Sequence, residues 1–261
     1  MPSPLPILPL RDTVLVPHVI TPILVGRPQS LAAVEAAMQG DRRLVLVAQK
    51  DAEVQAPASA DLHRVGVVAR LQHLARLPNG TVKAVIETLE RVRITRIQGA
   101  PPAADDAPTA PLRATTAAWP LAAALPEPPH APGAASGEGR VAPALAASAA
   151  ARRLAHRFEE YAAVQRRVPP EVVALLEEAP SAERLAWAVA AHLLVRSEIR
   201  QQLLETPDLP ALLGRLDEVL GAEIELLGLQ ARLDDKVRGT IARNQREFWL
   251  GEQLKAIHQE L

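Results

Sequence analysis

The stretch "VGVVARLQHLARLPNGTVKAVIETLERVRI", residues 65–94, gives the clearest structural signal in the N-terminal half of the chain. Between its two apolar arms lies "PNG", where Asn79 and Gly80 suit the positive φ angles of a tight hairpin turn. The second arm has two faces, one with Val92 and Ile94 and one with Arg91, Arg93 and Thr95. This period of two predicts a β-hairpin whose strands each have one buried and one solvent-facing side.

The same period extends outward from the hairpin, from Leu5 to about Trp119. "LVLVA" (44–48) reads as a buried strand, and "LRATTAAW" (112–119) can supply a closing strand. One short helix is expected between the strands, from Pro28 at its first turn to Gly40 at its end. The first half is therefore a β-rich domain with a single helical insertion.

A helical period begins after a segment rich in Pro, Ala and Gly. Prolines and the cap Ser181 predict helices over 144–168, 171–178 and 181–205. After Asp208, a candidate N-cap, one helix to the last residue would be about 80 Å long at about 1.5 Å per residue. The expected parts are residues 1–119 as a β-rich domain, 120–143 as a linker, 144–206 as a helical subdomain and 207–261 as a long connecting helix.

The long predicted helix carries two unusual features. Glycines recur at seven-residue intervals beside leucines, at Gly214, Gly221 and Gly228 and at Leu213, Leu220 and Leu227. They indicate either a weak or broken helix, or a close contact with another helix in which the leucines pack. Near the end of the chain one helical face is apolar, with Leu250, Leu254, Ile257 and Leu261. We expect this face to pack against a partner helix.

Composition limits the functions that the chain can have. The 29 Lys and Arg residues balance 30 Asp and Glu residues, so there is no global charge for binding nucleic acid. There is no cysteine, no recognisable secretory signal and no uncharged apolar run of about 18 residues. We therefore expect a cytoplasmic protein that does not enter a membrane.

Motifs for catalysis are missing from the sequence. It has no phosphate-binding glycine loop ending in Lys-Ser/Thr and no serine in a Gly-x-Ser-x-Gly context. None of the seven histidines pairs with another at the spacing of a helical zinc site. We expect no catalytic residue, no cofactor site and no metal site in this chain.

Two surfaces are candidates for binding. In "TVLVPHVITPILVG" (13–26) two prolines interrupt an apolar run, which predicts an exposed apolar loop with Pro17, Val19, Ile20 and Pro22; the alternative is that these residues pack into the domain core. Leu77, at the hairpin tip, is added to this surface. The second candidate is basic, either on one strand at Arg91, Arg93 and Arg96 or on the long helix at Arg232, Lys236, Arg238, Arg243 and Arg246. A solvated charged face is the alternative for the helix.

Five segments in order resemble the N-terminal region of bacterial ATP-dependent Lon proteases. They are "LPLRDTVLVPHVITPILVGRPQSLAAVEAAM" (8–38), "LVAQKDAEV" (46–54), the hairpin segment (65–94), "VPPEVVALLEEAPSAERLAWAVAAHL" (168–193) and "NQREFWLGEQLKAIHQEL" (244–261). The resemblance implies an α+β chain: a PUA-like β-rich domain, a helical subdomain and a long helix that leads into an AAA+ ATPase module and a Ser-Lys protease domain. The family's ATPase and peptidase residues match no position in this sequence. The Pro/Ala-rich segment 99–111 departs from the family and leaves the register of the last strands open.

The function that the resemblance implies is recognition and positioning of protein substrates. Unfolded or damaged proteins are the expected partners, captured by exposed apolar surface. The chain's own AAA+ and protease domains, a homohexamer, ATP and magnesium are implied for the full-length protein. The alternatives are a module that assembles or spaces the oligomer through the long helix, and a module that binds nucleic acid.

Overall fold

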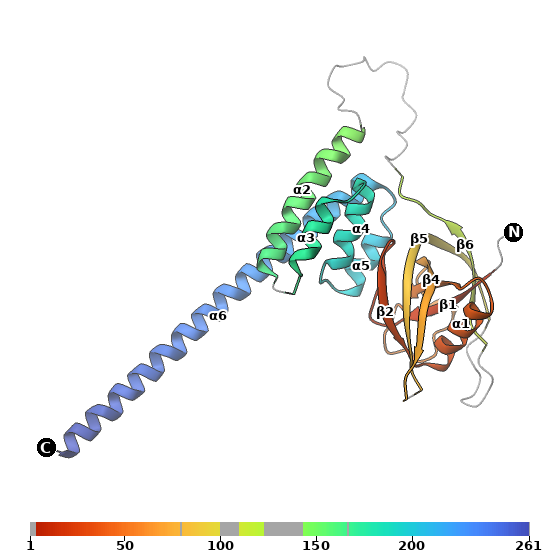
Figure 1. Cartoon of the computed structure of the whole chain (residues 1–261). Coiled ribbons are helices and arrows are strands. Elements are labelled where there is room, and N and C mark those ends of the chain that lie inside the picture. Colours follow the sequence, from red (N-terminus) through yellow and green to blue (C-terminus); the bar gives the residue numbers. More distant parts are fainter. Residues whose placement is uncertain (1–3, 79, 100–109, 123–142, 166, 261) are drawn as a thin grey trace, which may run out of the picture.

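A computed structural model describes residues 4–78, 80–99, 110–122, 143–165 and 167–260 (Figure 1). A sheet-rich body, a helical part beside it and one long helix that extends away from both are visible in the same view (Figure 1). The expected α+β class is confirmed, with a mixed sheet first and helices after it.

The sheet has six strands: β1 (Leu5–Leu10), β2 (Ile20–Val25), β3 (Arg43–Ala48), β4 (Val65–Arg76), β5 (Val82–Gln98) and β6 (Arg113–Ala118). Their order is β2-β5-β4-β3-β1-β6, and an additional pairing joins β5 to β6. Five strands therefore close into a ring, and β2 lies outside it. The β1–β3 pair is parallel, and the other pairs are antiparallel.

The length of β5 explains this arrangement. Its first part, Val82–Glu87, pairs with β2, and its second part, from Val92 to Gln98, pairs with β6. The β5 residues from Val82 to Arg93 also pair with β4 in the predicted hairpin, and Gly80 has the positive φ, 80°, that the turn requires. Asn79 lies outside the described residues. The helix α1 (Pro28–Gln39) packs against β1 and β3.

The helical part contains α2 (Pro143–Val164), α3 (Pro170–Glu177), α4 (Ala182–His192), α5 (Ser197–Leu204) and α6 (Leu209–Glu260). As predicted, Ser181 caps α4 by accepting a hydrogen bond from the Arg184 N–H. The single helix expected over 181–205 is wrong, because the chain becomes extended at Leu193. The Tyr161 hydroxyl accepts the Leu194 N–H there, and Arg200 donates to the Leu193 carbonyl, so side chains replace the helical hydrogen bonds.

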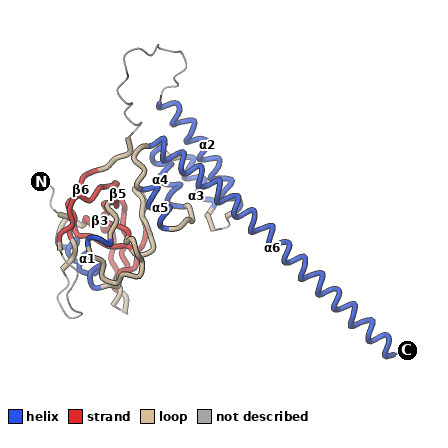
Figure 2. The backbone as a smooth tube through the Cα atoms, turned by 180° about the vertical axis from the view of Figure 1, so that it is seen from behind, coloured by secondary structure: helices blue, strands red, loops and turns tan. Residues whose placement is uncertain are grey.

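The long helix α6 is continuous, which makes the broken-helix alternative wrong. Asp208 caps it by accepting the Ala211 N–H at 2.8 Å. One face of its first turns is buried, and α6 runs beside α2 (Figure 2). Among the three glycines only Gly221 stands in a close contact, with Arg157 of α2, whereas an added Cβ would meet nothing within 4 Å at Gly214 or Gly228. Leu213 and Leu220 are buried and Leu227 is half-buried.

Arg91 joins the sheet-rich body to the helical part. The period of two in the sequence predicts that its side chain shares a solvent-facing side with Arg93, but Arg91 is only 4% exposed. Its Nε donates to the Trp119 carbonyl at 2.8 Å, and its Nη1 donates to the carbonyls of Leu204 and Thr206, where α5 ends. The guanidinium also lies 4.1 Å from the ring centroid of Trp119. Burial lowers the pKa of Arg91 to about 10, so it remains charged at neutral pH.

Gly66 of β4 provides a first test of the fold. A Cβ at this position would collide with the Leu46 carbonyl of β3, which is a backbone group that cannot rotate away. We expect Gly66→Ala to lower the free energy of unfolding by about 2 kcal/mol, as overpacking does. Urea denaturation measures this difference. The matched control is Gly228→Ala on α6, where the added methyl is unobstructed and the helix gains up to about 1 kcal/mol; equal effects of the two changes would contradict the close strand packing.

Candidate functional site

The segment before β2 is anchored to β5 by one buried threonine. The Thr88 hydroxyl donates to the Val16 carbonyl at 2.7 Å and accepts the Val19 N–H at 2.7 Å. The Thr88 backbone also exchanges hydrogen bonds with His18 and Val19. His18 takes a positive φ of 66°, which turns the chain into β2. This anchor fixes the residues that β2 presents to solvent.

An apolar row lies on the outer face of β2. Ile20 is 68% exposed, Leu24 is 71% exposed, and Pro22 between them is also exposed. The intervening residues Thr21, Ile23 and Val25 are half-buried or buried, as the alternation of a strand requires. We call Ile20, Pro22 and Leu24 the β2 row.

One edge of β2 has no neighbouring strand among the described residues, since β2 pairs with β5 alone. Val19 bonds to Thr88 of β5, so alternation directs the backbone groups of Thr21, Ile23 and Val25 to β5 as well. The backbone groups of Ile20, Pro22 and Leu24 therefore point away from β5. Because proline has no N–H, this outer edge offers two donors and three carbonyl acceptors.

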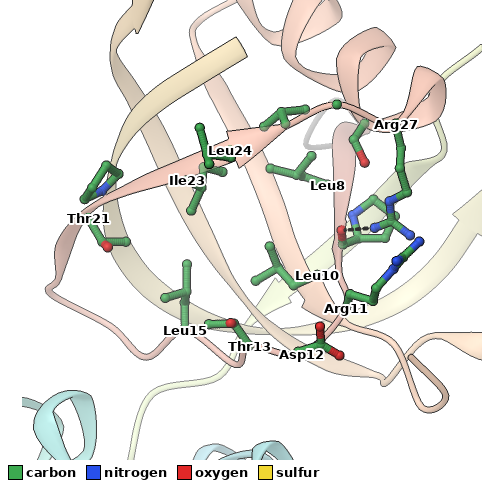
Figure 3. Close-up of a pocket in the computed structure, with 15 residues that line it drawn as sticks. Leu8, Leu10, Arg11, Asp12, Thr13, Leu15, Thr21, Ile23, Leu24 and Arg27 are labelled. Carbon is green, nitrogen blue, oxygen red and sulfur yellow. Dashed lines mark hydrogen bonds between the residues drawn. The ribbon is translucent and has the colours of Figure 1, made fainter. Parts of the chain in front are cut away.

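A groove of about 690 Å³ runs along this outer edge (Figure 3). It separates β2 from the end of β1 and the segment that follows β1, and its lining includes every residue from Thr21 to Gly26. Leu8, Leu10, Leu15 and Ile23 point into the space between the two walls (Figure 3). The groove has the size of small-molecule or peptide sites and an apolar floor.

One end of the groove is cationic. Arg11 and Arg27 lie there beside Asp12 (Figure 3). Arg27 donates only to neutral oxygens, at 2.7 Å to the Pro9 carbonyl and at 2.6 Å to Gln49 Oε1. Burial lowers the pKa of Arg27, and the nearby charge of Arg11 lowers it further, while Asp12 acts in the opposite direction. Two arginines against one carboxylate leave this end with a positive charge.

The structure separates the residues of the predicted apolar surface. Ile20 and Pro22 are exposed, but on a strand and not in a loop. Pro17 is buried and Val19 is half-buried, because the Thr88 anchor holds this segment against β5. Leu77 is 36% exposed and belongs to the hairpin tip, near the Val25 end of β2.

Leu24 and the groove were not predicted from the sequence. The signal for Leu24 was present, because Ile20, Pro22 and Leu24 occupy every second position of "ITPILV". The groove depends on the separation of β1 from β2, which no local pattern encodes.

The distal part of α6 is a second exposed apolar surface. Leu226, Leu229, Leu233, Val237, Ile241, Phe248, Trp249 and Leu250 are all at least 48% exposed. One of these exposed residues, Leu250, also belongs to the face that was predicted to pack against a partner helix. The side chains of Leu254 and Ile257, and all of Leu261, lie outside the described residues.

The basic candidates differ in accessibility. Arg91 is wrong as a nucleic-acid contact, because its guanidinium is occupied by carbonyls of the helical part. Arg93 and Arg96 are exposed, as are the five basic residues of α6. Within the described ranges no cluster of three His, Cys, Asp or Glu residues is arranged to hold a metal ion. No described helix combines the length and apolarity that crossing a membrane requires.

Comparison with known proteins gives one consistent result. Residues 4–221 match the family described as the ATP-dependent protease La (LON) substrate-binding domain. The chain is 36% identical over 263 residues to a Lon protease of Xanthomonas oryzae pv. oryzae and 34% identical over 257 residues to that of Escherichia coli K12. Each alignment covers 98% of this chain but only 27% and 30% of those two relatives, respectively.

A solved structure supports the fold. The N-terminal domain of a Mycobacterium avium complex Lon protease superposes with a TM-score of 0.59 at 19% identity, over 84% of this chain and 98% of that one.

Proposed function

The chain belongs to the Lon substrate-binding domain family, and we propose that it captures unfolded or damaged proteins and positions them for an ATP-dependent protease. The chain spans less than a third of the curated relatives that it matches. The ATPase and Ser-Lys protease domains, the ATP and magnesium they use, a homohexameric assembly and a cytoplasmic location are therefore part of the proposal for the whole protein.

The observation that carries this proposal is the β2 row beside an apolar groove. Folded proteins bury most of their large aliphatic side chains, so a surface that binds such side chains without a fixed polar pattern selects unfolded segments. Ile20 and Leu24 are each more than two-thirds exposed, and they lie four residues apart on the same face of β2. Contiguous exposed apolar residues of this kind mark protein-binding surfaces.

We expect Ile20→Asp to weaken binding of a reduced, unfolded protein about tenfold. The change removes an aliphatic contact worth roughly 1.5 kcal/mol and places a charge in the binding surface. Fluorescence anisotropy with a labelled, permanently unfolded protein measures the dissociation constant. The wild-type chain should bind the unfolded form better than the native form of the same protein.

The matched control is Leu175→Asp. Leu175 of α3 is 67% exposed, nearly as much as Ile20, but it lies in the helical part. Circular dichroism melts establish that both variants fold. Unchanged affinity of the folded Ile20→Asp variant, or equal losses in the two variants, would contradict the assignment of the β2 row.

A second candidate function is assembly of the oligomer through α6, favoured by the exposed apolar residues on its distal part. Such a helix commonly pairs with another helix to bury these side chains. Sedimentation velocity at several concentrations separates the two functions. Self-association that Leu233→Lys abolishes, without any change in binding of unfolded protein, would assign assembly to α6 and show that capture does not depend on its distal part.

A further inference from the structure

We propose that the groove beside β2 takes an extended apolar segment of an unfolded polypeptide as an added β-strand, with an acidic side chain of that segment at the Arg11 and Arg27 end. This inference rests on the proposed function and specifies how the substrate is held. The β2 row alone would bind apolar side chains in any backbone conformation. The groove demands an extended one.

The free backbone edge of β2 favours the addition of a strand. Polar backbone groups of Ile20, Pro22 and Leu24 point away from β5, and β2 has no strand on that side among the described residues. Adding a strand to a sheet edge satisfies such groups and gives affinity that does not depend on side-chain identity. The missing N–H of Pro22 removes one of six possible hydrogen bonds, which also discourages edge-to-edge pairing between two copies.

The groove floor favours an apolar segment. A strand that lies beside β2 directs every second side chain inward, onto the surface formed by Leu10, Leu15 and Ile23. These three residues are half-buried and pack on the domain core, so they are already ordered. The remaining side chains of the added strand lie beside the β2 row, where further apolar contact is available.

The positive charge at the groove end favours an acidic side chain in the bound segment. Arg27 has only neutral acceptors for its guanidinium and Arg11 donates to Gln55 Oε1, so neither forms a salt bridge in the described residues. A carboxylate that enters this end is attracted by both arginines and adds to the opposing charge of Asp12. The favoured segment is therefore apolar with an acidic residue next to it.

N-methylated peptides test the added strand. The probe is a fluorescent, extended peptide of about eight residues, with alternating aliphatic side chains and one Glu near its end. In one variant the odd-numbered amides are N-methylated, and in the other the even-numbered amides. Only one set of amides faces β2 in an added strand, so one variant should lose at least tenfold in affinity and the other should bind like the parent peptide. Equal affinities of the two variants would overturn strand addition.

The charged end is tested with the same peptide and its Glu→Gln analogue. We expect wild-type protein to prefer the Glu peptide about fivefold at low salt, and Arg11→Gln to abolish this preference. The control is Arg70→Gln, an exposed arginine of β4 that does not line the groove. Equal binding of the two peptides by the wild-type protein would overturn the role of the arginines.

Failure of this inference is distinguishable from failure of the proposed function. Unfolded protein that binds through Ile20 while both methylated peptides bind alike would overturn strand addition and leave capture by the β2 row standing. Absence of binding by unfolded protein and by peptide would overturn both.

Discussion

Replacing Arg91 with methionine is expected to lower the free energy of unfolding by about 4 kcal/mol, the largest single effect that we predict. Methionine keeps most of the apolar stem but removes the donors to the carbonyls of Trp119, Leu204 and Thr206. Each of these buried acceptors then bears a desolvation cost of about 1–3 kcal/mol. Urea denaturation followed by tryptophan fluorescence measures the loss, since Trp119 and Trp187 both lie near the guanidinium.

The matched control for Arg91→Met is Arg93→Met. Arg93 also stacks on Trp119, at 4.4 Å from the ring centroid, but its side chain is exposed. A cation–π contact at an exposed site contributes about 0.5–1 kcal/mol, so this variant should lose no more than that. Similar losses in the two variants would show that stacking, and not the hydrogen bonds to the end of α5, joins the two parts of the chain.

Leu216→Ala on α6 is expected to cost about 3 kcal/mol. Leu216 is fully buried where the first turns of α6 pack beside α2, and removal of a buried leucine side chain leaves a cavity. Leu233→Ala, on the same helix at 62% exposure, should change stability by less than about 0.5 kcal/mol. Thermal denaturation of the two variants provides the comparison.

Hydrogen exchange adds a local readout to the Leu216 experiment. Amides in the buried first turns of α6 should exchange only with global unfolding, whereas those beyond Leu226 should exchange through fraying of an exposed helix. Uniform protection along α6 would contradict the division into a packed and an exposed part.

Elements that depend on local chemistry could be predicted from the sequence. The hairpin turn needs a residue that tolerates positive φ, and Gly80 supplies it. Ser181 and Asp208 cap the helices that follow them, because their side-chain oxygens accept free N–H groups at the first turn. The length of α6 followed from the lack of proline beyond its first turn.

Elements that depend on contacts between distant residues could not be predicted in this way. The break after α4 has no glycine or proline, and it arises because Tyr161 and Arg200 bond to the backbone at residues 193 and 194. Arg91 looked solvent-facing in a period of two, and its burial depends on carbonyls more than a hundred residues away. Of the candidate site, the apolar segment was found, but the Thr88 anchor and the second wall of the groove are tertiary features.

The shape of α6 has a mechanical consequence. The helix is fixed only over its first turns, and from Glu225 to Glu260 it extends roughly 50 Å at about 1.5 Å per residue. A straight helix of this length acts as a lever arm: a tilt of about 5° at its root displaces its far end by roughly 4 Å, which is less than the ~5.4 Å rise of one helical turn. Any small rotation of the sheet-rich body that reaches the root of α6, through Arg91 or the leucines beside α2, would be amplified in this way at the distal end of α6.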